Sequence, residues 1–233
     1  MSRRAVVTGA GSGIGRATAQ RLRADGWQVL GLDLKADDQT VAADVTQEQA
    51  LVLAAQQFGD EPIDALVCAA GVWLAGDDRY TKVDLDAWNT TLAVNVTGTM
   101  LTMRVFAPRI HAGGAVVTVG SMAAIAGIPR RDAYTASKGA IVALTRAWAA
   151  DLIRFGVRVN CIAPGQVATP MTESVSGLDV NLLPLGREAE PAEIVEVIVS
   201  LINPAAGYLN GAIIPIDGGL TAASALAPLS PRK

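Results

Sequence analysis

Short apolar runs alternate with segments of helical periodicity along the whole chain, and this alternation is the strongest constraint on its fold. The apolar runs are four to six residues long and rich in Val, Ile and Leu, as buried strands are. They are Arg4–Thr8, Trp27–Leu32, Thr40–Ala43, Ala65–Ala69, Ala115–Val119, Val157–Ile162 and Ala212–Ile216. The segments with helical spacing or helix-start signals are Ile14–Arg23, Thr46–Phe58, Leu85–Arg109, Ala133–Phe155 and Pro191–Ile202. Strands separated by helices pair in parallel, which predicts a doubly wound, mostly seven-stranded parallel α/β sheet with helices on both faces.

Residues 1–221 are expected to form one domain, followed by a tail rich in Ala, Pro and Ser over residues 222–233. Only ten residues separate Asp33, after the second strand, from Asp44, after the third. A parallel crossover with its own helix needs about a dozen residues, so the helix between these strands should be missing. The next helix is expected to open with a capping box, Thr46 to Gln49.

A glycine-rich turn follows the first strand and leads directly into a helix. Its sequence from Thr8 to Gly15 is TGAGSGIG. Glycines allow a tight turn and a close approach to a pyrophosphate, whose charge is met by amide N–H groups at the helix N-terminus. Alone, such a turn could be merely a tight strand–helix connection. Here it stands near the start of an α/β domain, with an acid at the end of the second strand.

That acid is Asp33, 18 residues after Gly15. A carboxylate at this position can accept both ribose hydroxyls of adenosine and would repel a 2′-phosphate, so NAD is expected as the cofactor in preference to NADP. Lys35 leaves room for some NADP tolerance, and a solvated strand-end acid is the alternative interpretation of Asp33.

Tyr134 and Lys138 lie four residues apart and therefore on one face of a predicted helix. A free tyrosine titrates near ~10, and a neighbouring cation would lower that pKa toward the range of a useful acid/base. Ser121, at the end of the preceding strand, could donate a hydrogen bond to a substrate oxygen. An exposed Tyr–Lys pair and a turn serine are the alternative, which the glycine turn and Asp33 disfavour.

With its TGxxxGIG turn and Tyr–Lys pair, the chain resembles the short-chain dehydrogenase/reductase family over nearly its whole length. The resemblance implies that Tyr134 is the general acid/base and that Ser121 orients the reacting oxygen. It implies that Lys138 lowers the tyrosine pKa and holds the nicotinamide ribose, and that Asn95 anchors a water in a proton relay.

The resemblance also implies a set of cofactor contacts along the strand ends. These are Gly9, Ser12, Gly13, Ile14, Gly15, Asp33, Leu34, Asp44, Val45, Ala69, Gly71, Tyr134, Lys138, Pro164, Val167 and Thr169. The family's Asn-Asn-Ala-Gly is replaced by Cys68 to Gly71 (CAAG), which puts local packing in doubt. The segment between Pro170 and Pro191 is short, so the substrate pocket should be less enclosed than usual.

Composition argues against several other functions. With 19 Lys and Arg against 22 Asp and Glu, the net charge of −3 provides no general field for nucleic acid or anionic lipid. Two distant cysteines and the single His111, expected as a cation at a helix end, predict neither a disulfide nor a metal site. The charge-free stretches Ile110–Pro129 and Val197–Ile216 are interrupted by Gly, Pro, Asn or Ser, so no membrane span is expected. The cytoplasm is the expected location.

The sequence therefore predicts an NAD-dependent oxidoreductase acting on a secondary alcohol or ketone. The alternatives are an NADPH-preferring carbonyl or 3-oxoacyl-thioester reductase and a non-catalytic NAD-binding regulator. The substrate stays open. Candidate pocket residues are Val72, Trp73, Met122, Ile125 and the segment Met171–Leu183, any of which could be plain core. Arg130 and Arg131 could meet an anionic substrate or could be ordinary surface arginines.

Assembly is also predicted. From Ala87 to Met103 the chain carries no charge, and from Gly139 to Ala150 only Thr145 and Arg146 are polar. Helices with so little polar surface should each bury a second face, most economically against a partner subunit about a two-fold axis. A homodimer or homotetramer is expected.

Overall fold

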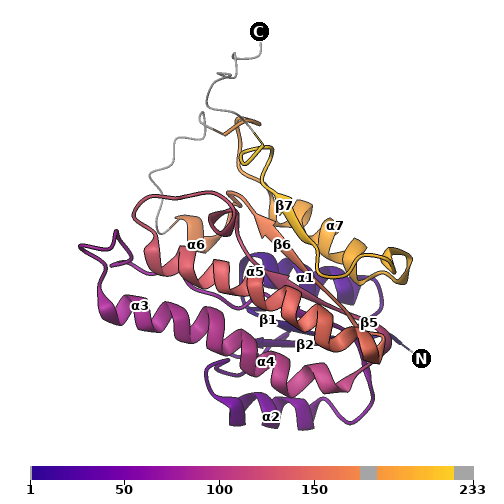
Figure 1. The fold of residues 1–233 in the computed structure, drawn as a ribbon. Helices are drawn as coiled ribbons and strands as arrows, with labels where there is room; N and C mark the ends of the chain where they lie inside the picture. Colours follow the sequence, from indigo (N-terminus) through magenta and orange to yellow (C-terminus); the bar gives the residue numbers. More distant parts are fainter. Residues whose placement is uncertain (1, 174–182, 223–233) are drawn as a thin grey trace.

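Seven parallel strands form a single sheet at the centre of the molecule (Figure 1). The computed structural model describes residues 2–173 and 183–222 of the 233. The strands are β1 (Arg4–Thr8), β2 (Gln28–Asp33), β3 (Val41–Ala42), β4 (Ile63–Cys68), β5 (Ile110–Val119), β6 (Arg158–Pro164) and β7 (Ile213–Ile216). Their spatial order is β3-β2-β1-β4-β5-β6-β7, so the winding reverses between β1 and β4. This is the predicted doubly wound α/β fold, and its ligand crevice is expected at that reversal.

Helices cover both faces of the sheet (Figure 1). The helices are α1 (Gly13–Ala24), α2 (Glu48–Gln57), α3 (Leu85–Leu92), α4 (Thr99–Phe106), α5 (Asp132–Leu152), α6 (Pro170–Glu173) and α7 (Pro191–Ile202). One core joins α1 and α7 to the sheet, and a second core joins α2, α4 and α5 to its other face.

Neighbouring residues of each strand enter different cores, as the period of two requires. In β1, Val6 packs toward α2 and α4, whereas Val7 packs toward α1 and α7. Leu66 and Val67 of β4 divide in the same way. Each such fully buried aliphatic side chain stabilises the fold by about 1.5–3 kcal/mol. The central strands are therefore apolar on both faces, which is why they appear in the sequence as unbroken apolar runs.

The connection between β2 and β3 contains no helix, as predicted. Residues 34–40 form a turn that Asp37 and Thr40 close on each other. The Thr40 hydroxyl donates to the Asp37 carboxylate over 2.8 Å, and the Asp37 amide donates to the Thr40 hydroxyl. This side of the molecule is consequently more open than a sheet edge covered by a helix.

The predicted single helix over Leu85–Arg109 is interrupted. A π-helical stretch, Ala93–Gly98, separates α3 from α4, and a 3₁₀ turn, Ala107–Arg109, ends the run. Asn95 lies inside the π-helical stretch, where its side chain bonds to the Val72 backbone instead of pointing to solvent. Such bulges often mark functional sites within helices.

Two local predictions were wrong. The helix α2 begins at Glu48 without a capping box, because the Thr46 hydroxyl donates instead to the Asp44 carboxylate over 2.8 Å. His111 does not lie at a helix end. It belongs to β5, which begins earlier than the apolar run suggests, and its Nε2 lies 3.0 Å from Oδ1 of Asp64.

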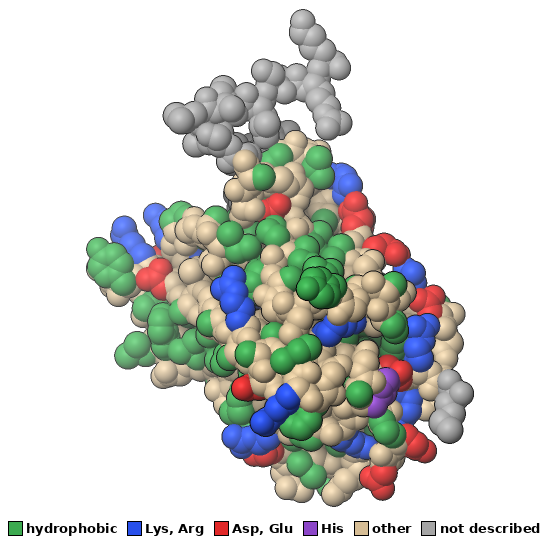
Figure 2. Space-filling view, turned by 45° about the vertical axis from the view of Figure 1, so that its right-hand side comes forward, with side chains coloured by type: hydrophobic (Ala, Val, Ile, Leu, Met, Phe, Trp, Pro, Cys, Tyr) green, Lys and Arg blue, Asp and Glu red, His purple; other side chains and the backbone are tan. Residues whose placement is uncertain are grey.

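Charges do not gather in one region of the face shown in Figure 2, where Lys and Arg are interspersed with Asp and Glu. Among the described residues no helix combines the length and hydropathy needed to cross a bilayer.

The His111–Asp64 pair predicts a pH-dependent stability. The Asp64 carboxylate raises the pKa of His111 above its ordinary 6.5. The stabilisation is therefore complete below the unfolded-state pKa and is lost as pH rises through the folded-state pKa. His111→Gln should lower the melting temperature at about pH 5.5 and leave it nearly unchanged at about pH 8.5. Thermal melts at both pH values test this, and an equal decrease at both would contradict it.

Candidate active site

A cavity of about 550 Å³ lies at the carboxyl ends of β1, β4, β5 and β6. Every residue predicted to bind the cofactor lines it, from Gly9 in the first turn to Thr169 after β6. Ser121, Tyr134 and Lys138 line the same cavity. Asn95 does not, because it is buried behind the loop that follows β4. Parallel strands thus place residues that are far apart in sequence around one space.

The glycine turn is a cradle that side chains would fill. Gly9 has a φ of +69°, and a Cβ there would lie 2.8 Å from the Ala70 amide nitrogen. A Cβ on Gly15 would lie 2.2 Å from the Gly9 carbonyl oxygen. The first turn of α1 has no acidic residue, and its N-cap residue Ser12 makes no side-chain cap bond. The helix N-terminus therefore remains suited to an anion, and these residues fit a dinucleotide pyrophosphate.

Asp33 fixes the glycine turn from the end of β2. Its Oδ2 accepts a hydrogen bond from the Gly11 amide and its Oδ1 accepts one from the Leu34 amide, both at 2.8 Å. A carboxylate has about four acceptor positions, so two backbone donors leave capacity for further hydroxyls. Leu34 is 68% exposed beside it, consistent with an open adenosine side.

Ser121 and Tyr134 reach the cavity from β5 and α5. Ser121 follows the β5 strand and caps a short 3₁₀ turn, its Oγ accepting from the Ala123 amide at 3.1 Å. Tyr134 stands in the first turn of α5. Burial raises the pKa of Tyr134, and a hydrogen bond from Ser121 offsets only part of that rise.

Lys138 lies one helical turn beyond Tyr134 and is only 6% exposed. Its Nζ donates to the Val119 carbonyl over 2.9 Å and lies 5.5 Å from the centre of the Tyr134 ring. Burial lowers the pKa of Lys138 to about 8. Burial of the phenol is the largest influence on the Tyr134 pKa in this structure, and the lowering of that pKa by Lys138 stays a prediction.

Asn95 joins three parts of the site. Its Oδ1 accepts from the Val72 amide at 2.7 Å, and its Nδ2 donates to the Val72 carbonyl and to the Ser137 hydroxyl, both at 3.0 Å. A Cβ on Gly71 would lie 3.3 Å from Asn95 Oδ1 and 3.5 Å from Lys138 Nζ. The amide therefore holds the loop after β4 against α5, and all its hydrogen-bonding groups are engaged by protein.

The replacement of the family's first asparagine by Cys68 is accommodated by packing. Cys68 is 3% exposed within the core shared by α2 and α4, and burial raises the pKa of its thiol to about 12. The Ala70 amide donates to the Thr8 hydroxyl over 3.2 Å. Residues 174–182 of the short segment between Pro170 and Pro191, and with them most of the candidate Met171–Leu183, lie outside the described residues.

The candidate substrate residues are distributed unevenly. Val72 lines the cavity, and the Trp73 ring stacks on the Tyr134 ring with centroids 5.5 Å apart. Met122 is half-buried, and Ile125 is 47% exposed.

Several lining residues were not predicted. Thr90 and Val94 face the cavity from α3 and the π-helical stretch. They lie four residues apart on one side of the helical run, just before Asn95, and this spacing could have indicated them as lining residues. Thr172, which belongs to the candidate segment Met171–Leu183, organises the chain after β6: its hydroxyl oxygen lies 2.7 Å from the Val167 carbonyl oxygen and 2.8 Å from that of Thr169.

Asp77 is the clearest omission. It is 6% exposed, and its two carboxylate oxygens accept from the amides of Ala133 and Tyr134 at 2.9 and 3.0 Å. A carboxylate from a distant loop thus caps the helix that carries Tyr134, in the favourable sense for the helix dipole. Sequence alone offered no signal, because Asp77 and its neighbour Asp78 are alike without the tertiary contact.

Comparisons with known proteins agree with this geometry. The family model described as enoyl-(acyl carrier protein) reductase matches residues 9–221. Trans-4-hydroxycyclohexanecarboxylate dehydrogenase of Sinomonas cyclohexanicum is 33% identical over 95% of this chain and 94% of its own. Galactitol 2-dehydrogenase (L-tagatose-forming) of Cereibacter sphaeroides is 38% identical, covering 93% and 94%. The crystal structure of levodione reductase superposes with a TM-score of 0.86 at 30% identity, covering 95% and 98%.

The chain belongs to the short-chain dehydrogenase/reductase family. Dehydrogenases of this family use nicotinamide cofactors and act on CH–OH groups, so the chain is an oxidoreductase of that class.

The Asp77 contacts predict a stability effect. Asp77→Asn replaces one acceptor oxygen by an NH₂ group that faces an amide N–H. The free energy of unfolding should therefore fall by about 1–3 kcal/mol. Hydrogen exchange at the amides of Ala133 and Tyr134 should accelerate. Asp78→Asn is the matched control and should change stability by less than about 0.5 kcal/mol. Similar losses in both variants would contradict a specific cap.

Proposed function

We propose that this chain is an NAD(H)-dependent dehydrogenase/reductase that interconverts a secondary alcohol and its ketone, with Tyr134 as the general acid/base. The observation that carries the proposal is that Ser121, Tyr134 and Lys138 share one cavity with the glycine cradle. Two relatives named for the oxidation of secondary alcohols support it.

The bound nicotinamide would supply or accept the hydride. In the reductive direction the Tyr134 hydroxyl gives its proton to the substrate oxygen, and in the oxidative direction the phenolate takes it back. Ser121 Oγ donates a hydrogen bond to the same oxygen. A positioned acid/base of this kind contributes roughly 10²–10⁴-fold to the rate.

The burial of Lys138 determines which role its side chain would have in the mechanism. In this cavity desolvation favours the neutral forms of both Tyr134 and Lys138. A cofactor ribose held by Lys138, as the resemblance implies, would replace part of the missing hydration of the ammonium. Asn95 acts by fixing Val72 and Ser137 around the pair, and its implied relay water remains a prediction.

NAD in preference to NADP rests on Asp33. Its carboxylate lies at the open adenosine side, where it can accept ribose hydroxyls and repel a 2′-phosphate. Leu34, Asp44 and Val45 line the same end of the cavity.

An acyl-thioester reductase is the second candidate function, because the matching family model is described as an enoyl-(acyl carrier protein) reductase. A cytoplasmic location is part of the proposal, supported by two buried free thiols.

Tyr134→Phe tests the chemistry. It keeps the ring and removes the transferable proton, so turnover of a secondary-alcohol panel with NAD should fall by at least roughly 10²-fold. NADH affinity, measured by fluorescence titration, should change little. Near-normal turnover in this variant would refute the mechanism. If the wild type binds NADH but turns over no alcohol, ketone or acyl thioester, a non-catalytic regulator is favoured instead.

Asp33→Ala tests the cofactor assignment. Removing the carboxylate loses both the ribose acceptors and the repulsion of a 2′-phosphate, so the ratio of kcat/KM for NAD over NADP should fall. Absolute NAD efficiency should also fall, because Gly11 loses its partner. Steady-state kinetics with both cofactors give the ratio. A wild-type enzyme that already prefers NADP would show that the assignment is mistaken.

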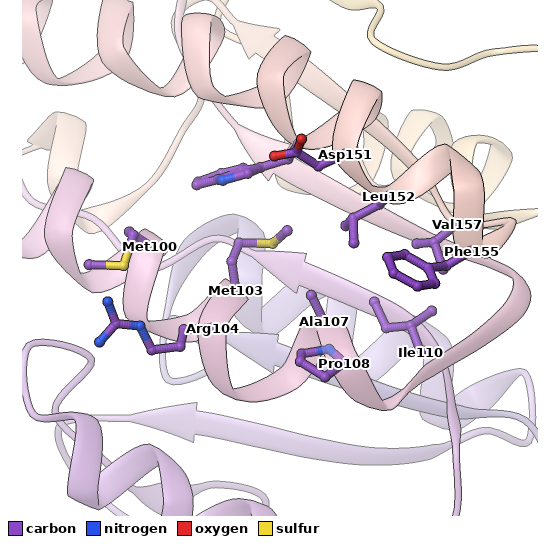
Figure 3. A pocket seen from close by; sticks show the side chains of 11 residues that line it. Met100, Met103, Arg104, Ala107, Pro108, Ile110, Asp151, Leu152, Phe155 and Val157 are labelled. Carbon is purple, nitrogen blue, oxygen red and sulfur yellow. The ribbon is translucent and has the colours of Figure 1, made fainter.

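We also propose that two copies pair through α4 and α5. An apolar groove of about 520 Å³ runs between these helices (Figure 3). Met100, Met103 and Pro108 form one wall and Leu152 and Phe155 the other. Arg104 lies on the α4 side and Asp151 on the α5 side. Arg104 also pairs with Glu48 of its own chain over 3.2 Å. A two-fold axis would place the same apolar walls of two copies against each other, as an isologous interface requires.

Light scattering tests the assembly. The wild type should have two or four times the 24.0 kDa mass of one chain, and Met100→Glu, at a half-buried methionine, should reduce that mass by placing a charge in the groove. Leu53→Glu, at a half-exposed leucine of α2 outside the groove, is the control and should leave the mass unchanged. A wild-type mass of one chain would refute the proposal.

A further inference from the structure

An arginine is linked to the reacting tyrosine through one indole ring. The Trp73 ring stacks on the Tyr134 ring with centroids 5.5 Å apart and an interplanar angle of 28°. The guanidinium carbon of Arg131 lies 4.1 Å from the centre of the Trp73 ring. Arg131 precedes Tyr134 by three residues, at the start of α5, whereas Trp73 comes from the loop after β4. Two separate segments therefore build this stack, and Tyr134 is the member of it that lines the cavity.

The backbone holds the guanidinium in place. Arg131 Nη1 donates to the Arg130 carbonyl over 2.9 Å. Arg130 has a φ of +61°, the left-handed region that a residue with a side chain adopts at a cost. Cation–π contact with Trp73 fixes the other side of the group.

The charge of Arg131 has no partner among the residues that the structure describes. No carboxylate there lies within 4.0 Å of its guanidinium nitrogens. The nearby acid Asp77 is engaged by the amides of Ala133 and Tyr134, and Asp78 Oδ1 accepts from the Arg79 amide. A guanidinium has five N–H donors, and the Arg130 carbonyl uses only one nitrogen. The buried Trp73 Nε1–H also has no acceptor there.

Arg131 is a half-buried residue, and its oriented guanidinium with free donors is suited to bind a carboxylate through paired hydrogen bonds. We propose that Arg131, oriented by Trp73, binds a carboxylate on the substrate, so that the substrate class is a hydroxy acid. Because the indole spaces the guanidinium from the phenol, the acid and the carbinol carbon should be separated by a ring or chain rather than be adjacent. This inference rests on the proposed function, since it names the substrate of the same site.

Binding without turnover provides the first test. Cyclohexanecarboxylate and cyclohexanecarboxamide have no hydroxyl to oxidise, and their affinities can be measured by calorimetry with NADH present. The wild type should bind the acid more tightly than the amide. In Arg131→Gln that preference should fall by about 10- to 100-fold, the usual value of a charge-assisted hydrogen bond. Arg131→Lys should keep part of it.

Arg154→Gln is the matched control. Arg154 also makes a cation–π contact, 4.7 Å from the Phe155 ring, but it lies just beyond the C-terminal end of α5. The preference for the acid should be unchanged in this variant. Equal wild-type affinity for acid and amide, or a preference retained in Arg131→Gln, would overturn the inference.

Turnover separates this inference from the proposed function. The ratio of kcat/KM for 4-hydroxycyclohexanecarboxylate over its primary amide should be high in the wild type and should fall in Arg131→Gln. Turnover of secondary alcohols with no preference for the acid would refute the carboxylate site and leave the proposed function intact. An acid preference in binding, together with no oxidation of any alcohol, would support the site and refute the proposed function.

Discussion

The parallel pairing of β1 with β4 is the constraint on which the site depends. These neighbouring strands lead in opposite directions across the sheet, so the loops that follow them diverge and leave a crevice. The same loops must still pass each other closely, with Gly9 directly against the backbone of Ala69 and Ala70. A side chain at Gly9 would push the two strand ends apart. The cavity therefore lies where the loops after β1 and β4 diverge, directly beside the point at Gly9 where their backbones pack closely.

The loop after β4 is held by polar contacts to both neighbouring helical elements. Asn95 binds the backbone of Val72, Asp77 caps α5, and Trp73 stacks on Tyr134. The buried polar groups of Asn95 and Asp77 are satisfied by backbone or by another side chain, which fixes this loop before any ligand enters. The chemistry that we propose for Tyr134 thus depends on residues that do not touch the reacting atoms.

Sequence periodicity predicted the sheet because the central strands are buried on both faces. Their apolar runs could not be mistaken for amphipathic strands or long helices. It failed where local patterns compete with tertiary contacts. The run over Leu85–Arg109 looks like one helix, yet the side chain of Asn95 bonds to Val72, 23 residues away, and the helix carries a π-helical stretch there. The Thr46 hydroxyl donates to the nearby Asp44 carboxylate, so it does not form the predicted capping box.

The sequence by itself determined the doubly wound fold class, because short apolar runs alternate with helices, and most residues around the cavity, because its motifs resemble those of one family. Only the tertiary structure decided how those residues are charged and held. Burial raises the pKa of Tyr134 and lowers that of Lys138, although their spacing alone suggested a cation acting on a phenol. The roles of Asp77 and Arg131 likewise depend on contacts between separate segments. Desolvation and long-range hydrogen bonds arise only when distant parts of the chain pack together, and no local sequence pattern encodes them.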